Sequence, residues 1–582
     1  MKNYILITFL LFSFNLVAVV TVGSSPGFGT CTYTTIQTAI DSGEAEIRVL
    51  NNQDFSENLN INRSVIIKGG YNSCLSAQVD SVGENKTVIR GNNVIGAPVI
   101  KINTGLTTLP IVNLYRLQLS DAVDTAFSDG GRGINIGNSN VFLQIIDSLI
   151  SNNSAEKGAG IYVDDPDDVT VYLTNSIVNG NTASIQGGGM YCANSNTNFI
   201  IEGSSLIKEN TAFDGGGLFA TFSCNVTISA GAHILINGAE AGIMNNIANN
   251  AGGGLYVDLG ASIKFYGNRY GTGGLLGDPS VPVVLANNHA NQKGGGIYAD
   301  RNATITIEDG LIINNKAENN ISGKGGAFYV DNGAELTIKK APYAECWNVN
   351  NHCSSISHNW TDFRGGAVYA LRGAKINIDN SRINANVAES GSFAYMQDLT
   401  TQAQLKNNFI FENGNSFASN NNKAVIDLSD SATVEIYHNT IANNYIANNN
   451  AAISILTSSS LMIKNSIVYN DNNPVLIKDP NSAIDAECVV VNEPLTLLGT
   501  VIIDGQPDLI DDVITGYHLG GNSEAIDLCA NLDAQIIGLS TDIDGDIRPF
   551  DDLSVSNGLG TADAGADESY FNNDVIFNND FE

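Results

Sequence analysis

The chain has 582 residues, of which 43% are hydrophobic and only 15% are charged, so it is not a disordered acidic tail. Its 60 acidic and 28 basic residues give a formal net charge of −32, which opposes binding to nucleic acid and to anionic membranes. Abundant glycine (59) and scarce proline (12) favour a β-rich chain with many tight corners. The length allows several ordinary domains or one repetitive solenoid.

Residues 1–23 are predicted to be an export signal peptide. Lys2 supplies a short positive region, the run from Tyr4 to Val22 is almost entirely apolar, and small residues follow it. The alternative is an uncleaved membrane anchor, which the polar residues inside the run disfavour. No later segment is long and apolar enough to span a bilayer, so we expect no transmembrane segment after signal removal.

The next region, 24–90, is predicted to form an N-terminal cap and the first coils of a solenoid. Tyr33–Ile40 has two isoleucines four residues apart, which indicates a short amphipathic helix. Strands are expected near Ile47–Leu50 and Val65–Ile67. Such a cap hides the first coil and its edge strands from solvent.

The middle of the chain repeats a block of alternating apolar residues that ends in one or two asparagines. In the copy that begins at Ala303, apolar side chains alternate with polar ones, which is the pattern of a strand with one buried face. The clearest copies are Val141–Asn153, Val169–Asn181, Ala303–Asn315, Ala374–Asn386 and Ala432–Asn444.

A second block follows the first, with a glycine cluster, an aliphatic residue and usually an aromatic residue. Its copies are Gly187–Tyr191, Gly215–Phe219, Gly252–Tyr256, Gly294–Tyr298, Gly325–Tyr329 and Gly365–Tyr369. No hairpin dipeptide joins the strands, so each repeat returns one layer higher and the strands are parallel. Glycines are expected at corners, and equivalent asparagines are expected to stack into a ladder.

The sequence therefore predicts an all-β protein, a single-stranded right-handed parallel β-helix with caps at both ends. We place the helix at 91–490, with inserted loops near 258–285 and 341–363, and the C-terminal coils and cap at 491–568. The tail, 569–582, is either a sorting signal or a frayed terminus. Other repeat folds fit worse. The sequence has no leucine framework for leucine-rich repeats, no recurring tryptophan for a WD-type propeller and no long 3.6-residue period for helical repeats.

Eight cysteines suit an oxidising compartment, and disulfides are favoured over free thiols or a zinc site because no CxxC pair exists. Eight cysteines allow many connectivities. Proximity in the sequence suggests Cys31–Cys74, Cys192–Cys224, Cys346–Cys353 and Cys488–Cys529.

Several segments resemble known families. The openings Thr35–Asp41 and Ser64–Gly70 are similar to those of many secreted right-handed β-helix proteins, and the repeats resemble those of bacterial polymorphic outer-membrane adhesins. The ordered C-terminal pieces Asn522–Asp527, Asp542–Pro549 and Asp563–Glu568 resemble the end of the choice-of-anchor (type Q) β-helix family. The resemblance implies a bacterial secreted or cell-surface protein with a pectin lyase-like fold.

One acidic cluster is a weak candidate for a calcium site. Asp164, Asp165, Asp167 and Asp168 place four carboxylates on one turn, and calcium prefers such oxygen ligands. No spacing motif supports a cage, so a solvated corner of an acidic protein is favoured instead.

A second weak calcium candidate is formed by Asp542, Asp544 and Asp546. The EF-hand pattern fails here because the glycine comes too early and no glutamate closes the loop. We therefore interpret Asp544 and Arg548 as residues that hold the cap together. No cofactor is expected, and Ca²⁺ is the only ion that these carboxylates suggest.

The segment 341–363 interrupts the repeat and contains the ligand-contact candidates Trp347, Trp360, His352 and His358. An aromatic loop on a rigid solenoid is a suitable ligand-contact site, and a loop that only covers the core is the alternative. A zinc site from these histidines and a cysteine has no supporting spacing. The other histidines, including His438, are expected at the surface.

The nearly uniform repeat concentrates no catalytic set, so catalytic residues are not assigned. The favoured function is an exported, monomeric β-helix that binds glycan or protein surfaces and no nucleic acid. The alternative is a polysaccharide lyase or glycoside hydrolase on the same scaffold, which needs a base with a cation or paired carboxylates.

Overall fold

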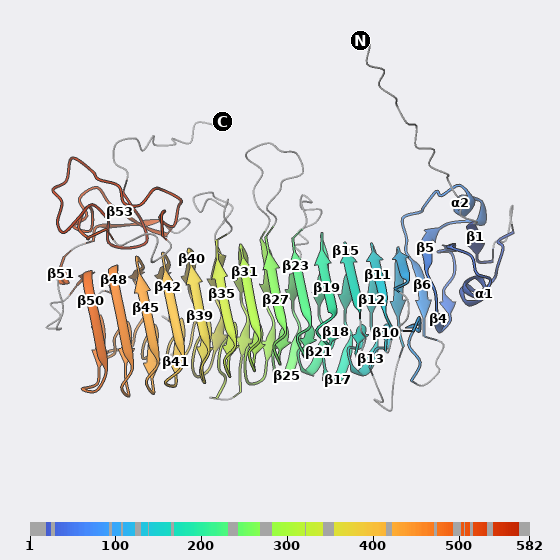
Figure 1. Cartoon of the computed structure of the whole chain (residues 1–582), viewed down its shortest axis with the longest axis horizontal. Coiled ribbons are helices and arrows are strands. Elements are labelled where there is room, and N and C mark those ends of the chain that lie inside the picture. The colour runs from blue at the N-terminus through green and yellow to red at the C-terminus, as the bar shows by residue number, and fades with distance from the viewer. Residues whose placement is uncertain are drawn as a thin grey trace, which may run out of the picture.

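A computed structural model describes residues 19–24, 30–91, 96–105, 109–122, 130–137, 139–164, 168–230, 242–267, 282–319, 322–340, 354–414, 422–470, 474–492, 502–505, 507–512, 516–531 and 539–569. The described chain is a parallel β-helix whose coils stack side by side along the long axis (Figure 1). This confirms the predicted fold class. No helix among the described residues is long and apolar enough to cross a membrane.

The coil that begins at β15 (Val169–Thr174) shows the plan of the repeat. A corner at Asn175, with φ of 50°, leads to β16 (Ile177–Asn179), and a second corner leads to β17 (Thr182–Gln186). β18 (Met190–Cys192) follows a glycine corner, and the next coil starts with β19 (Thr197–Glu202). Val169 pairs with Thr197 in a parallel ladder, so each coil places its first strand beside the first strand of the coil before it.

Sheet A contains two parallel ladders that meet at the first corner of each coil. The first ladder is β1 (Val19–Val22), β2 (Glu46–Leu50), β5 (Val65–Tyr71), β8 (Ile111–Tyr115), β11 (Val141–Ile146), β15, β19, β23 (Asn225–Ser229), β27 (Ser262–Tyr266), β31 (Thr304–Glu308), β35 (Glu335–Lys339), β39 (Lys375–Asp379), β42 (Gln402–Lys406), β45 (Thr433–Tyr437), β48 (Ser460–Tyr469) and β50 (Ala483–Val491).

The second ladder of sheet A carries the shorter strand of each coil and ends on β48, β50 and β51 (Ile502–Asp504). Its other strands are β3 (Phe55–Ser56), β6 (Thr87–Arg90), β9 (Leu117–Ser120), β12 (Leu149–Ser151), β16, β20 (Leu206–Lys208), β24 (Gly242–Met244), β28 (Val283–Ala286), β32 (Gly310–Ile313), β36 (Ser354–Ser357), β40 (Ser381–Asn384), β43 (Phe409–Phe411) and β46 (Thr440–Ala442).

Sheets B and C complete each coil. Sheet C is β13 (Ser154–Lys157), β17, β21 (Thr211–Asp214), β25 (Ile247–Ala251), β29 (His289–Ala290), β33 (Lys316–Ala317) and β37 (Trp360–Thr361). Sheet B is β4 (Leu59–Ile61), β7 (Ile100–Ile102), β10 (Ile134–Ile136), β14 (Ile161–Val163), β18, β22 (Leu218–Ala220), β26 (Leu255–Val257), β30 (Ile297–Ala299), β34 (Phe328–Val330), β38 (Val368–Ala370), β41 (Ala394–Gln397), β44 (Ile426–Ser429), β47 (Ile453–Ile455) and β49 (Leu476–Lys478).

Alternate side chains of each strand point into one continuous apolar core. In β15, Val169, Val171 and Leu173 are fully buried, whereas the residues between them face outward. The same alternation recurs from coil to coil, so the core runs the length of the helix. A coil cannot bury this face alone, and its stability depends on the coils on either side.

The predicted asparagine ladder is confirmed. At the corner before sheet C, the Nδ2 of each buried asparagine donates to the Oδ1 of its equivalent in the next coil at 2.9–3.1 Å. The ladder consists of Asn153, Asn181, Asn210, Asn246, Asn288, Asn315, Asn359, Asn386, Asn413 and Asn444.

The glycine clusters also fall in register. Gly252 has φ of 68°, a left-handed conformation that glycine adopts without strain. A Cβ on Gly253 would lie 2.3 Å from the carbonyl oxygen of Gly295 in the next coil, so only glycine fits between the coils. These two requirements explain why the glycines recur as clusters.

The N-terminal expectations hold in part. α1 (Ile36–Asp41) buries Ile36 and Ile40 and is capped by the Thr35 side chain. The two strands expected near Ile47 and Val65 are present as β2 and β5. However, β1 lies within the predicted signal and pairs with β2, and Val22 is fully buried. Cleavage after residue 23 would remove this strand, whereas a boundary before Val19 would keep it.

The structure contains three of the four disulfides that proximity suggested. Cys31 bonds to Cys74 in α2 (Cys74–Gln78). The other two pairs are Cys192–Cys224 and Cys488–Cys529. Cys346 and Cys353 lie outside the described residues.

The predicted second insertion is too long. The segment 341–363 was expected to be a loop, but the coil resumes at β36 and continues through β37. Both strands keep the parallel register, with Ile312 opposite Ile356 and Lys316 opposite Trp360. The parallel ladder therefore resumes at Ser354. The sequence did not reveal this, because the strands of this segment are short and contain few apolar residues.

The C-terminal region contains β52 (Leu509–Asp512) and β53 (Gly516–Leu519), which pair antiparallel. It then folds back onto the side of the helix, over the corner that joins the two ladders of sheet A (Figure 1). Asn407 and Asn465 donate to backbone carbonyls of this cap at 3.0 and 2.9 Å. The cap therefore covers a flank of the solenoid.

Candidate functional site

Sheet B carries an aromatic stack on its outer face. The middle residue of each strand points away from the core, and neighbouring ring centroids are 4.5–5.7 Å apart. The rings pack closely on one another from coil to coil, so the stack stiffens this flank of the helix. Its members are Tyr162, Tyr191, Phe219, Tyr256, Tyr298, Tyr329, Tyr369 and Tyr395.

Cations border this stack at the glycine corner between sheets C and B. Lys157 lies 5.5 Å from the ring centroid of Tyr191, and three further cations follow on consecutive coils. Lys293 lies 5.0 Å from the ring centroid of Tyr329, Lys324 lies 5.1 Å from that of Tyr369, and Arg364 lies 4.5 Å from that of Tyr395. Parallel bridges join Lys293 to Lys324 and Lys324 to Arg364. We call Lys293, Lys324 and Arg364 the basic row.

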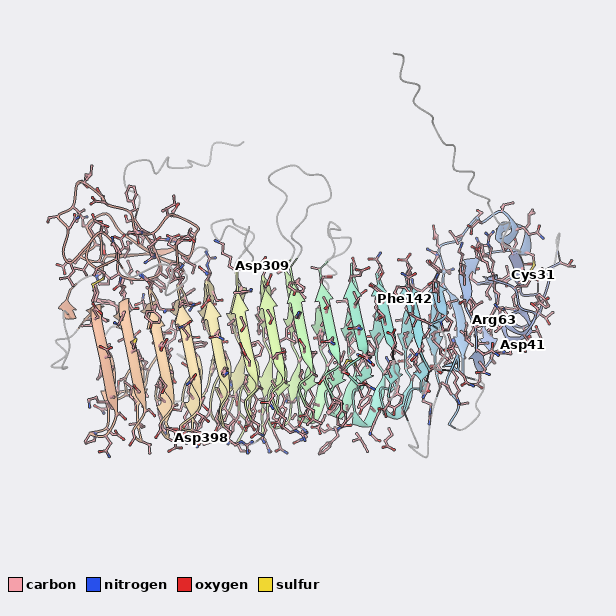
Figure 2. The ribbon with its side chains drawn as sticks, viewed as in Figure 1. Cys31, Asp41, Arg63, Phe142, Asp309 and Asp398 are labelled. Carbon is pink, nitrogen blue, oxygen red and sulfur yellow. A yellow bond between two sulfur atoms is a disulfide. The ribbon has the colours of Figure 1, made fainter. Side chains whose placement is uncertain are left out.

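A groove of about 1030 Å³ lies at the opposite edge of sheet B. It crosses the turns that connect sheet B to the next coil of sheet A in five successive coils, and Figure 2 shows Asp398 on this lower corner farther along the helix. The Phe222 side chain is 59% exposed there. The lining residues are Asp164, Ala193, Asn194, Ser195, Phe222, Ser223, Leu259, Gly260, Arg301 and Asn302.

The charged groups at the groove have polar partners within the protein. Arg301 Nε donates to Asp258 Oδ1 at 2.6 Å, and Asp258 is buried. Asp300 accepts the backbone N–H of Arg301 at 2.9 Å and an N–H of Asn332 at 2.6 Å. Asp164 accepts the hydroxyl hydrogen of Tyr162 at 2.6 Å. These contacts hold the turns in place. The groups that the groove offers to a ligand are therefore mainly amides, hydroxyls and the Phe222 ring.

The first acidic cluster is only partly described. Asp164 lines the groove and Asp168 is exposed at the end of the same turn, whereas Asp165 and Asp167 lie outside the described residues. The structure brings no third described metal-ligand side chain to Asp164 and Asp168. A calcium site on this turn stays a prediction.

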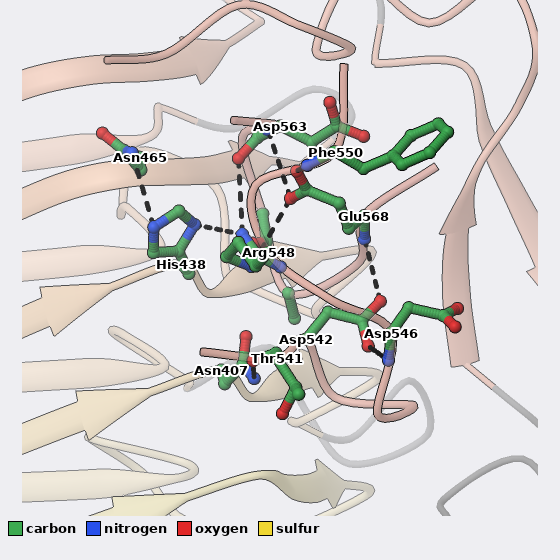
Figure 3. Close-up of polar contacts among 12 residues, drawn as sticks. Asn407, His438, Asn465, Thr541, Asp542, Asp546, Arg548, Phe550, Asp563 and Glu568 are labelled. Carbon is green, nitrogen blue, oxygen red and sulfur yellow. Dashed lines mark hydrogen bonds and ion pairs between the residues drawn. The ribbon is translucent and has the colours of Figure 1, made fainter. Parts of the chain in front are cut away.

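The second calcium candidate has another role in the described cap. One oxygen of Asp542 accepts the N–H groups of Asp544, Gly545 and Asp546 at 2.8–3.0 Å. Figure 3 shows Asp542 beside Asp546. Asp542 is buried, which raises the pKa of its carboxyl, whereas Asp546 is exposed. Among the described residues these three carboxylates do not form a group with metal-ligand spacing, and Asp542 shapes the loop. A calcium site at this loop stays a prediction.

Arg548 connects the cap to the β-helix. Its guanidinium contacts His438, donates to the Gly565 carbonyl at 3.1 Å and lies 3.5 Å from the Glu568 carboxylate (Figure 3). His438 is 2% exposed, so its expected surface position is wrong. Burial and the neighbouring Arg548 hold the pKa of His438 well below its usual value, so His438 is neutral.

A second histidine, His518, lies between two cap carboxylates. Its Nδ1 is 3.3 Å from Asp544 and 3.2 Å from Asp567. Burial lowers the pKa of His518, but the hydrogen bond and charge of Asp567 and the charge of Asp544 outweigh it and raise the pKa to about 9. The three side chains have the donor types of a metal site. A protonated His518 also accounts for the arrangement, because its positive charge lies between the two carboxylates.

We expect the cap to lose stability as the pH rises from 6.5 to 9. The pKa of His518 is about 9 in the folded cap and 6.5 in the unfolded chain, so its contribution is complete below pH 6.5 and is lost as the pH rises through 9. The loss is on the order of 3 kcal/mol. Burial also raises the pKa of the Asp542 and Asp563 carboxyls in the folded cap. Their contribution to the free energy of unfolding is likewise lost as the pH rises from the pKa of an unfolded aspartate to the raised value in the cap.

Denaturant unfolding of the parent and of His518→Gln at pH 6 and pH 9 measures this effect. The histidine contribution should disappear in the variant, whose unfolding free energy should then vary less with pH over this range. Equal pH dependence in both proteins would show that His518 does not hold its proton in the folded cap.

The aromatic and histidine candidates are not all on a loop. Trp360 lies in β37 with the Lys316 ammonium 4.6 Å from its ring centroid, and exposed His358 forms the preceding corner, with φ of 54°. Trp347 and His352 lie outside the described residues. The structure thus places Trp360 on the sheet C side of the basic row.

Sequence reasoning missed Phe222, Arg301 and the basic row. A signal for the basic row was present, because a basic residue directly precedes the glycine cluster at 294, 325 and 365. An isolated phenylalanine in a turn carries no comparable signal, since a turn in the sequence does not show which other turns adjoin it.

The fold and these surfaces define an extended parallel β-helix with a stiffened flank. Residues 282–300 match the Chlamydia polymorphic membrane protein repeat. This stretch contains β28, the ladder residue Asn288, the glycine cluster at 294–296 and β30. The match therefore covers the residues that form the corners of one coil. No curated protein matches the chain.

Proposed function

We propose that this chain is an exported, surface-exposed, adhesin-like β-helix that binds a neutral oligosaccharide in the corner groove. The groove with exposed Phe222 is the observation that carries the proposal. The similarity of one coil to a polymorphic membrane protein repeat supports a surface role. Three disulfides among the described residues support an oxidising compartment outside the cytoplasm.

The chemistry of the groove supports a neutral sugar ligand. An exposed aromatic ring packs against the apolar face of a sugar, and nearby amide and hydroxyl groups of Asn302, Ser195 and Ser223 provide polar contacts for its hydroxyls. The Arg301 guanidinium is engaged by Asp258, so the groove does not present a free cation to an acidic ligand.

Rigid placement also supports binding. Four of the five turns that line the groove are short connections between strands that are hydrogen bonded to adjacent coils. The Cys192–Cys224 disulfide links two neighbouring coils at the residues next to the lining residues Ala193 and Ser223. A pre-formed site loses less entropy when a ligand binds.

Phe222→Ala should weaken binding of the oligosaccharide at least tenfold, because loss of the ring removes both buried area and stacking, about 1.4 kcal/mol or more. A glycan array would identify the sugar, and calorimetry with the full chain would measure its affinity. Phe213→Ala is the matched control, since Phe213 is 48% exposed on sheet C, away from the groove. Equal affinities of both variants, or no neutral glycan bound by the parent, would refute the proposed function.

A further inference from the structure

We infer that the basic row, Lys293, Lys324 and Arg364, binds a linear acidic glycan that runs parallel to the helix axis. Uronate-containing or sulfated polysaccharides have the required chemistry, which is one anionic group on successive sugars. This site is separate from the corner groove, because the two lie at opposite ends of the sheet B strands.

The basic row is regular in space. Its members occupy equivalent positions on three consecutive coils, as the parallel bridges between them show. Hydrogen-bonded strands lie about 4.8 Å apart, so the backbone positions of the row advance by about this distance per coil. A polysaccharide with one anionic group per sugar presents charges at a comparable repeat, whereas a small anion would engage only part of the row.

The aromatic stack holds the cations in place. Lys293 lies 5.8 Å from the centroid of Tyr298 and 5.0 Å from that of Tyr329, and Arg364 lies 4.5 Å from the ring centroids of Phe363 and Tyr395. Contact with ring faces stabilises a cation without neutralising its charge. The row is therefore positioned before any ligand arrives.

The charge of the basic row is not balanced by ion pairs. Among the described residues, no carboxylate lies within salt-bridge distance of Lys293, Lys324 or Arg364. The carboxyl of Asp214 interacts with Lys293 from farther away, and that of Asp427 interacts with Arg364; burial raises the pKa of both carboxyls. Burial, and then the charges of Arg364 and Lys293, lower the pKa of Lys324.

Three uncompensated cations in a chain of net charge −32 therefore repel one another at close range. An anionic polymer would supply the missing countercharge at each coil. The rest of this acidic molecule repels a polyanion, so we expect the ligand to contact the row alone, and nucleic acid with its denser charge is disfavoured.

The neighbouring surface offers further contacts for sugar rings. Phe363 and Trp360 are partly exposed on the sheet C side of the row, and Lys316 adjoins Trp360. Lys316 is itself paired with Glu318, so it adds little charge. Aromatic side chains beside cations suit a glycan, which presents both apolar ring faces and anionic groups.

The experiment compares the full chain with Lys293→Gln/Lys324→Gln in binding to size-defined polygalacturonate and heparin fragments, with neutral dextran and single-stranded DNA as further probes. At low ionic strength the parent should bind at least one acidic glycan, and the double variant should bind it at least tenfold more weakly, with a smaller dependence on salt. Lys264→Gln/Lys375→Gln, which removes two exposed lysines of sheet A, is the charge-matched control and should bind like the parent.

Circular dichroism and thermal unfolding show whether the variants keep the parental fold. Binding that the double variant retains, equal binding of dextran or DNA, or no binding of either acidic glycan by the parent would overturn the inference. Phe222→Ala should leave acidic-glycan binding unchanged. This variant therefore distinguishes failure at the basic row from failure of the proposed function at the groove.

Discussion

Replacement of Asn246 by alanine should lower the free energy of unfolding by about 4 kcal/mol, because several buried polar groups lose their partners at once. Asn246 is fully buried, and its Oδ1 accepts both the backbone N–H and the side-chain N–H of Asn210 at 3.0 Å. Its Nδ2 donates to the Ile207 carbonyl at 2.9 Å. Each buried polar group left unsatisfied costs about 1–3 kcal/mol.

Denaturant unfolding would measure the loss, and hydrogen exchange would localise it to the adjoining coils, since a solenoid transmits stability mainly between neighbours. Asn198→Ala is the control, because Asn198 lies on the outer face of β19 and is not a ladder residue. It should change stability by no more than about 0.5 kcal/mol. If both substitutions cost the same, the amide ladder is not a main source of stability.

Arg548→Met should destabilise attachment of the cap by about 3–5 kcal/mol, because it removes one partner of a buried charged network. The Arg548 side chain is 3% exposed, and the Glu568 side chain beside it is fully buried. Without the guanidinium, the Glu568 carboxylate has lost its nearby positive charge. Limited proteolysis should then cleave the cap while the β-helix coils stay protected.

A second substitution separates charge from packing. In Arg548→Met/Glu568→Gln the buried negative charge is also removed, so part of the lost stability should return. Additive effects of the two substitutions would contradict a direct interaction. Unchanged proteolysis of Arg548→Met would contradict the role of Arg548 in holding the cap on the helix.

The regular part of the fold could be predicted because its determinants are repeated locally. Alternation within a strand, an asparagine at the corner before sheet C and a glycine cluster before many of the sheet B strands recur in the sequence. Each copy places its residues at the same point of the coil, so stacking converts a one-dimensional pattern directly into ladders. Asn315 and Gly294 illustrate this, since their positions in the repeat predicted their positions in the structure.

The candidate surfaces were predicted less well. Trp360 was expected on a loop, yet it belongs to β37 because its segment keeps the parallel register with Lys316. Phe222 and the groove gave no signal, since the groove exists only where the turns of five coils adjoin. Asp164 was singled out for calcium but lies in this groove.

By itself, the sequence determined the parallel β-helix, its asparagine ladder and its glycine corners, because contacts between coils repeat at nearly equivalent positions. Only the tertiary structure decided that the cap lies along the flank and buries His438 under Arg548. That contact joins residues 110 positions apart and occurs once, so no periodic pattern announces it. The basic row is intermediate, because its residues recur in the sequence but only stacking brings their charges together.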